Sequence, residues 1–233
     1  MPRRRPARTA VRHRPPAPRA RPPRPPGRPR RDAASSRQRL LDAAAAEFAA
    51  HGFAGASVDR IAAAAGLNKA MIYYHFASKA GLYGEILRDM FGAVSVEVRA
   101  VAASSEPPPQ KIRAFVEAIA REAEDRPHFP PIWFREIAEG GAHLDAAVLR
   151  ILGGIVGSLA SIVEEGVHAG RFVRVDPLVI HAAIVAPLLL FFASRGVRGR
   201  LERAGLPGAT AVTRQMVVGH VQRMSLAALE GRL

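Results

Sequence analysis

Two short helical stretches that meet at a tight turn constrain the fold of this chain more than any other feature. Ser57 is a favourable N-cap for the first stretch, in which apolar residues recur at helical spacing. Gly66 can adopt the positive φ that a tight turn requires, and Asn68 can cap the second stretch, residues 69–76. A helix fixed in this way against its neighbour fits the major groove of DNA, so residues 57–76 predict a helix-turn-helix.

Cationic and hydroxyl side chains surround the second stretch where DNA phosphates would lie. Lys69 and Lys79 lie on either side of it, and the chain contains three lysines in all. Ser57 begins the first stretch, where free backbone amides offer an anion site, and Tyr74 and His75 add polar groups to the second. Phosphate contacts position a protein on DNA, whereas contacts to base edges give sequence specificity.

The flanking sequence predicts further helices and hence an all-α fold. A helix from about Ser35 ends at Gly52, and Ser78 caps a longer helix that continues to Val94. Glu106–Pro109 interrupts the helical pattern and predicts a hinge. No stretch shows the sustained alternation of a strand, and five more helices are expected at residues 110–125, 130–139, 145–169, 177–194 and 209–230.

Residues 1–34 form an Arg/Pro-rich tail that we expect to be disordered. Residues 1–31 contain twelve arginines and no acidic residue, which leaves about +2 of the net charge of +14 for the rest (14 − 12). The charge of the whole chain therefore says little about its folded part. The tail is either a non-specific arm that binds nucleic acid through phosphates or an extension without function, and the sequence favours neither.

The composition is that of a cytoplasmic protein with no membrane partner. The absence of cysteine excludes disulfides and fits a reducing compartment. No apolar stretch follows the basic N-terminus, so no signal peptide is expected. The most apolar segment, residues 178–193, contains His181 and Pro187 and is shorter than the roughly 20 residues of a membrane span. We therefore expect it to be a buried or interface helix.

Residues 35–94 resemble the N-terminal domain of the tetracycline-repressor (TetR) family. The resemblance lies in a helix that ends in FAAHGFAGAS, followed by VDRIAAAAGLNKAMIYYHFASKAGL. The box Tyr73-Tyr74-His75-Phe76, with Ser78, Lys79 and Leu82 after it, is highly specific in this context. In that family a three-helix domain binds DNA, and helix four joins it to a larger helical domain that binds an effector and dimerises.

The resemblance implies a DNA-binding domain over residues 35–94 and an effector-binding and dimerisation domain over residues 95–233. It implies phosphate contacts from Ser57, Lys69, Tyr74 and Lys79, and base contacts from Asn68, Ala70, Met71 and Tyr73. From the residues alone, Tyr73 and Phe76 could instead be core, and His75 could be a packing residue or a phosphate contact. Ala70 and Met71 offer apolar contact rather than bidentate hydrogen bonds, so no operator sequence follows from them.

Gly81 departs from the family pattern, which often has an acidic or helix-forming residue at this position. Glycine costs roughly 1 kcal/mol relative to alanine inside a helix, so we expect helix four to start loosely. With the Glu106–Pro109 break, such a start would let helix four pivot and change the separation of two DNA-reading helices.

The C-terminal half predicts an apolar cavity for an unidentified small-molecule effector. Ile132–Leu144 and the EEGVHAGRFVRVDP run resemble the effector domains of such regulators. An apolar residue at any of these positions is more often ordinary core than part of a ligand cavity. The candidates are Phe115, Ile119, Trp133, Ile137, Leu152, Val156, Leu159 and Val185, with Arg135, His168 and His181 as polar groups.

Metal, cofactor and catalytic sites are not expected. The histidines are scattered without HxxxH or HExxH spacing, and no P-loop, GxSxG or Rossmann pattern occurs. Glu136 and Glu139 look like part of a solvated or ion-paired helix face. The function predicted is a sequence-specific transcriptional regulator, a repressor released by a small apolar effector. The alternatives are an architectural or activating DNA-binding protein without an effector, and an enzyme with a helical substrate cavity.

The last two expected helices predict a homodimer, because they are apolar over more than one face. A monomer would expose a large apolar patch, whereas two copies could pair these helices across a two-fold axis. The residues expected at this interface are Leu188, Leu189, Phe191, Phe192, Val217, Val221, Met224 and Leu226.

Overall fold

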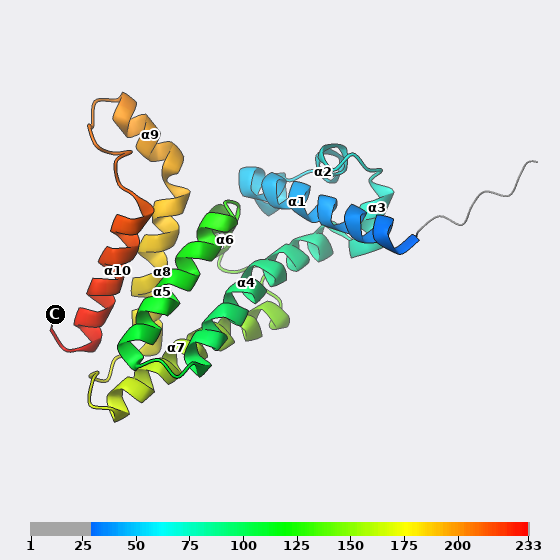
Figure 1. The fold of residues 1–233 in the computed structure, drawn as a ribbon. Helices are drawn as coiled ribbons and strands as arrows, with labels where there is room; N and C mark the ends of the chain where they lie inside the picture. Colours follow the sequence, from blue (N-terminus) through cyan, green and yellow to red (C-terminus); the bar gives the residue numbers. More distant parts are fainter. Residues whose placement is uncertain (1–28, 233) are drawn as a thin grey trace, which may run out of the picture.

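The computed structural model describes residues 29–232, and every regular element within that range is an α-helix (Figure 1). The all-α prediction is therefore confirmed. The ten helices are α1 (Pro29–Gly55), α2 (Val58–Ala64), α3 (Ala70–Phe76), α4 (Lys79–Ala103), α5 (Pro108–Asp125), α6 (Phe129–Ala138), α7 (Ala146–His168), α8 (Pro177–Ala193), α9 (Arg195–Arg203) and α10 (Arg214–Leu229).

Helices α1, α2 and α3 and the start of α4 form a small head at one end of the molecule (Figure 1). Its centre consists of fully buried side chains, among them Leu40, Phe48, Ile61, Ile72 and Leu82. The apolar spacing predicted these positions because each lies on the inner stripe of its helix.

Helix α1 differs from its prediction at the start and agrees at the end. It begins at Pro29, six residues before the expected start at Ser35, because proline is tolerated in the first helical turn. Gly52 breaks it with φ 67° and ψ 177°, as the sequence predicted. The tail prediction for residues 1–28 lies outside the described residues.

Helix α4 is the connection between the head and the body. Its first turns pack against α1 and α3, and the rest lies along α5 and α7. The expected boundary between residues 94 and 95 falls inside this continuous helix. The apolar stripe predicted for it is buried, at Leu82, Ile86, Leu87, Met90, Phe91 and Val94.

The start of α4 is tightly fixed, contrary to the expectation of a loose start at Gly81. Ser78 caps the helix by accepting a hydrogen bond from the Gly81 amide at 2.9 Å. A Cβ atom on Gly81 would lie 2.1 Å from the carbonyl oxygen of Phe76, a distance that no real Cβ contact shows. Glycine is therefore present because the end of α3 approaches α4 closely.

Hydrogen bonds hold the connection between α4 and α5 in place, contrary to the expected hinge. Lys111 of α5 is nearly fully buried and donates hydrogen bonds to the Ala102 carbonyl at 3.1 Å and to Glu165 of α7 at 2.6 Å. These bonds join the end of α4 to α5 and α7. The break itself is at the predicted place, between Ala103 and Pro108.

The body consists of α5 to α10, with α5 and α7 beside α4, and α8 and α10 side by side on the outer edge (Figure 1). Helix α9 projects beyond this body and was not predicted. It has no buried residue, and among its arginines and glycines only Val197 and Leu201 are large apolar residues, which is too short a stripe to reveal a helix.

One helix in the described range, α7, is long and apolar enough to cross a membrane by length and composition. Helices α8 and α9 meet the same criteria as a pair that bends by 56°. Buried core helices also meet these criteria, and α7 buries Val148, Ile155, Leu159 and Ile162 against the other helices.

Candidate DNA-binding surface and ligand cavity

The turn between α2 and α3 is built by the capping residues that the sequence predicted. The Ser57 hydroxyl accepts a hydrogen bond from the Arg60 amide at 3.4 Å at the start of α2. Gly66 has φ 64°, and the Asn68 side chain accepts a bond from the Ala70 amide at 2.9 Å. Local hydrogen bonds therefore hold α3 against α2.

Helix α3 has one buried side and one exposed side. Ile72 and Phe76 are buried in the head, whereas Tyr73 is 53% exposed and Tyr74 is 75% exposed. The sequence left open whether Tyr73 and Phe76 pack in the core or contact DNA. In the structure Phe76 is part of the core and Tyr73 is on the surface. Asn68, Lys69 and Ala70 are also exposed, and Met71 is half-buried.

The expected phosphate-binding groups lie around α3, and some already have partners within the chain. Lys69 forms an exposed ion pair with Asp59 at 3.1 Å. Lys79 donates to the Ala54 carbonyl at 3.3 Å, and its ammonium lies 4.9 Å from the centre of the Phe53 ring. The His75 ring is half-buried with its Nε2 atom inside the protein, so this nitrogen does not face the surface.

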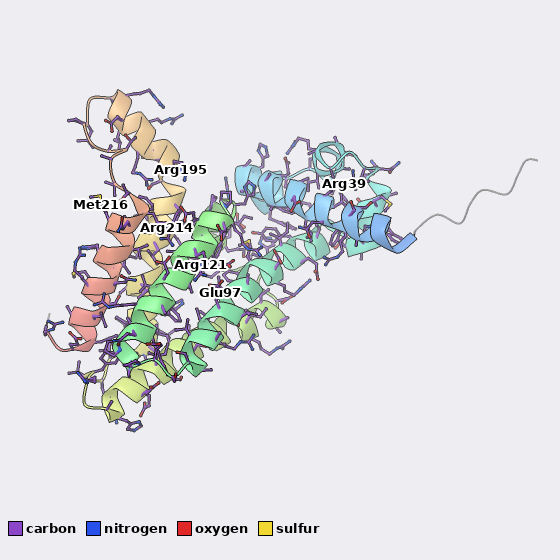
Figure 2. The ribbon with its side chains drawn as sticks, in the orientation of Figure 1. Arg39, Glu97, Arg121, Arg195, Arg214 and Met216 are labelled. Atoms are coloured by element: carbon purple, nitrogen blue, oxygen red, sulfur yellow. The ribbon has the colours of Figure 1, made fainter. Side chains whose placement is uncertain are left out.

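Two features of this surface were missed from the sequence. Arg39 of α1 is exposed, and its guanidinium lies within about 4 Å of the space that a Cβ on Gly66 would take (Figure 2). Glu47 of α1 receives bonds from the Ser57 amide at 2.9 Å and from the Arg60 side chain at 2.8 Å, which lowers the pKa of its carboxyl. Both contacts join residues far apart in sequence, so helical spacing gives no signal for them.

The body contains a small apolar cavity of about 30 Å³ between α4, α5, α6, α7 and α8. Its walls include five of the predicted effector residues: Ile119, Trp133, Leu152, His181 and Val185. The other wall residues are Phe91, Val94, Phe129 and Ile155. His181 is the polar group on this wall, and its burial lowers the pKa of the imidazole.

The remaining effector candidates lie elsewhere. Phe115 and Leu159 are fully buried core, and Val156 is half-buried on α7 outside the cavity wall. Ile137 is 56% exposed, and His168 pairs with Glu164 on the surface at 3.4 Å. Arg135 donates to the Ala50 carbonyl at 3.1 Å and thereby contacts the head. Apolar spacing along a helix does not show whether a residue lines the cavity, packs in the core or lies on the surface.

A second cavity, of about 310 Å³, lies where the head meets the body and was not predicted. It is lined by α1, by α4 and by the turn between α5 and α6, with Asp42, Asp89, Asp125 and Arg126 as its charged residues. Arg126 is paired with Asp89 across it.

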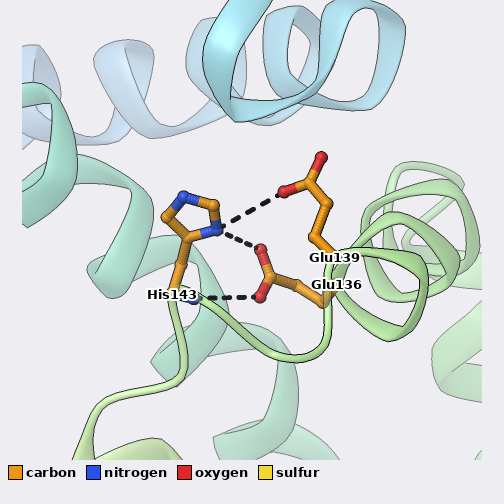
Figure 3. Close-up of side chains that lie close together, drawn as sticks. All are labelled: Glu136, Glu139 and His143. Carbon is orange, nitrogen blue, oxygen red and sulfur yellow. Dashed lines mark hydrogen bonds and ion pairs between the residues drawn. The ribbon is translucent and has the colours of Figure 1, made fainter.

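The prediction for this face of α6 was a solvated or ion-paired face, and the ion-paired alternative is confirmed, since Glu136 and Glu139 each pair with His143. The solvated alternative is wrong for Glu136, because its side chain is fully buried. Tyr83 of α4 donates its hydroxyl to the carboxylate at 2.8 Å, and His143 contacts it through Nδ1 at 2.8 Å (Figure 3). Burial and this bond raise the pKa of the Tyr83 phenol well above its usual range. The sequence reading missed this group because its members come from three separate segments.

An exposed apolar stripe runs along α8. It consists of Leu178, Val179, Ala182, Ala183, Ala186, Pro187 and Leu190. A groove of about 510 Å³ joins it at Pro187 to Met216 and Val217 of α10.

The predicted set of dimer-interface residues was partly wrong, because Leu188, Leu189, Val221 and Leu226 are buried inside the protomer. Helix α8 is apolar on all sides, so its sequence does not reveal which side faces the core.

Comparison with known proteins agrees with this fold and this head. Residues 40–86 match the family model for bacterial regulatory proteins of the tetR family. The transcriptional repressor NicS of Pseudomonas putida is 31% identical over 159 residues, which cover 67% of this chain and 74% of NicS. The regulator RutR of Escherichia coli is 23% identical over 143 residues, 61% of this chain and 67% of RutR.

Solved structures of similar fold cover most of the chain. The regulator PfmR of Thermus thermophilus has a TM-score of 0.63 at 22% identity and covers 83% of this chain and 95% of its own. A tetR-family regulator from Rhodococcus has a TM-score of 0.68 at 19% identity, with 83% and 96% covered. The head geometry, the family match and the long alignment with NicS together show that this chain belongs to the TetR family of DNA-binding transcriptional regulators.

Proposed function

We propose that this regulator is a repressor that binds its operator as a homodimer and is released by a small apolar effector. The observation that supports the first part is the exposed side of α3, where Tyr73 and Tyr74 project from a helix anchored by Ile72 and Phe76. We propose that Asn68, Ala70, Met71 and Tyr73 face the bases. The phosphate contacts would come from Ser57, Lys69, Tyr74 and Lys79. Residues 35–94 would read DNA, and residues 95–233 would bind the effector and dimerise.

The proposed dimer uses the apolar stripe of α8 together with the neighbouring part of α10. Leu178, Val179 and Leu190 are each about 60% exposed in the single chain, at 64%, 63% and 59%. Seven apolar positions in one continuous stripe form a patch of the kind that soluble monomers rarely expose. Pairing two such faces across a two-fold axis would bury them and fix the separation of the two α3 helices.

The proposed effector site is the cavity beside Trp133 and His181. At about 30 Å³ it holds no more than about one water molecule, whereas small-molecule sites run to roughly 300–1,000 Å³. An effector must therefore open it by moving the surrounding side chains. Trp133 lies on α6, which also carries Arg135 and Glu136, two residues whose side chains form hydrogen bonds with the head.

This arrangement links the cavity to the head through one short helix. A ligand that displaces Trp133 would favour the position of α6 that best accommodates it, and Arg135 and Glu136 would move with that helix. The ligand can shift the equilibrium only by its difference in affinity between the two positions. A typical coupling of about 1–3 kcal/mol weakens operator binding by roughly 5- to 150-fold.

Trp133→Ala tests the effector part of the proposal. A DNA site is first selected from random duplexes, and a ligand is first found by its effect on the wild-type protein's affinity for that site. Fluorescence anisotropy then gives the operator affinity of both proteins with and without that ligand. We expect Trp133→Ala to bind DNA normally and to lose the response. A response equal to that of the wild type would place the effector site elsewhere.

The small size of the cavity favours one alternative, a DNA-binding protein that uses no effector. The Arg-rich tail would then supply much of the affinity through phosphates. Deleting residues 1–28 should lower both the affinity and its dependence on salt while leaving the sequence preference unchanged. If the full-length protein binds all duplexes alike and the deletion removes most of that affinity, the alternative is supported and the assignment of specificity to α3 is wrong.

A further inference from the structure

The corner between α6 and α7 brings three potential metal ligands together. One carboxylate oxygen from each of Glu136 and Glu139 and one ring nitrogen of His143 all lie within 4.8 Å of one another (Figure 3). The imidazole nitrogen is 2.8 Å from the Glu136 oxygen and 3.6 Å from the Glu139 oxygen. We propose that these three side chains bind one divalent transition-metal ion of the zinc class.

The backbone of the corner places His143 over the end of α6. Helix α6 ends at Ala138, and Gly140 and Gly141 follow with φ 70° and 74°. Two successive left-handed residues turn the chain back, so that His143 faces Glu136 in the last turn of α6 and Glu139 just beyond its end. Other side chains rarely adopt this conformation, so the EGGAH sequence is suited to forming the corner.

The charges of the cluster favour a bound cation. Glu136 is fully buried, and His143 is the basic side chain that contacts its carboxylate among the described residues. Glu139 has the same partner in that part of the chain, so one imidazole faces two carboxylates. A buried carboxylate is costly unless a cation balances it. One divalent ion would neutralise both glutamates and leave His143 as a neutral ligand.

The geometry needs little change to hold the ion. Zinc binds histidine nitrogen and carboxylate oxygen at about 2.0–2.2 Å, so two ligands on one tetrahedral ion lie about 3.3 Å apart. The Glu139 distance of 3.6 Å is close to this value, and the Glu136 distance of 2.8 Å must open by roughly 0.5 Å. Tyr83 and the His143 amide hold the Glu136 carboxylate in place, as outer hydrogen bonds do for metal ligands.

The fourth coordination position faces solvent. The side chains of His143 and Glu139 are 24% and 42% exposed, so water can complete a tetrahedral set. The His143 ring also packs against Phe53 of the head, with ring centres 4.2 Å apart. The proposed ion therefore lies at the junction of head and body, and its binding does not depend on the effector proposal.

Isothermal titration of the full-length, chelator-treated protein with Zn²⁺ tests the site. The wild type should bind one ion per chain through these residues. His143→Ala should lose that binding, and Glu139→Gln should weaken it at least tenfold. Glu139→Gln alters an exposed side chain and should fold normally, which circular dichroism checks. His168→Ala is the matched control, because it removes another surface His–Glu pair that has no third ligand.

The proposal predicts that only the corner variants lose binding. It is overturned if the wild type binds no Zn²⁺, since the three side chains would then only contact one another. It is also overturned if Glu139→Gln and His143→Ala bind Zn²⁺ as the wild type does, or if His168→Ala removes the binding instead.

Discussion

Gly81→Ala should destabilise the protein, although alanine is the better helix former. Gly81 lies in the first turn of α4, and a Cβ atom there would meet the Phe76 carbonyl oxygen at 2.1 Å. Ordinary Cβ contacts begin at about 3.4 Å, so the end of α3 would have to move by roughly 1 Å. Because Phe76 is the last residue of α3, the strain acts on the helix that we propose reads DNA.

The magnitude follows from two opposing effects. Alanine gains up to about 1 kcal/mol from helix propensity. Overpacking of a well-packed site costs about 1–3 kcal/mol, and the clash here is with backbone rather than with the end of a flexible side chain. We expect a net loss of about 1–2 kcal/mol in the free energy of unfolding, and weaker operator binding as α3 shifts.

Gly92→Ala is the matched control on the same helix. A Cβ at Gly92 meets no atom within 4 Å, so this substitution should stabilise the protein by about 0.5–1 kcal/mol. Urea denaturation at one fixed protein concentration compares both variants with the wild type. If Gly81→Ala is as stable as the wild type or more stable, the close approach of α3 to α4 is not what requires glycine.

Three further predictions follow from buried groups and from the exposed stripe. Tyr83→Phe removes a hydrogen-bond donor to the fully buried Glu136 and should lower the free energy of unfolding, measured by urea denaturation, by about 1.5–3 kcal/mol. A change below about 0.5 kcal/mol would contradict the buried hydrogen bond. Burial lowers the pKa of His181, so below about pH 6.5 the unfolded chain binds a proton that the folded protein resists. The wild type should therefore lose stability as the pH falls from about 6.5 towards the lowered pKa of the folded state. Melting temperatures at pH 7.5 and 5.5 should show a smaller loss of stability for His181→Leu than for the wild type. Equal losses would contradict burial of the imidazole. Leu190→Asp on α8 should convert the dimer to a monomer in analytical ultracentrifugation, while Val96→Asp, on an exposed position of α4, should not; a dimer that survives Leu190→Asp does not use this stripe.

Local signals made the head predictable from sequence. The N-caps at Ser57 and Ser78, the left-handed Gly66 and the break at Gly52 are set by residues within a few positions of one another. Each acts through the backbone of its own turn, so the order of the first four helices and the starts of α2 and α4 follow from short stretches of sequence.

Contacts between distant segments were not predictable in the same way. The burial of Glu136 depends on Tyr83, which is 53 residues away and donates its hydroxyl to the carboxylate. The cavity is similar: helical spacing marked Trp133 and Ile137 alike as apolar, but the first lines the cavity and the second is exposed. Helical periodicity gives the face of a helix but not the element that packs against it.

The account rests most on the assignment of α3 as the DNA-reading helix. The most direct test selects bound sequences from random duplex DNA with the full-length protein, and then measures the affinity of Lys69→Ala and Tyr74→Phe for the selected site. We expect an inverted repeat whose half-sites lie about one helical turn apart, or a multiple of it, and weaker binding by both variants. Selection of no preferred sequence, or unchanged affinity in both variants, would contradict the assignment.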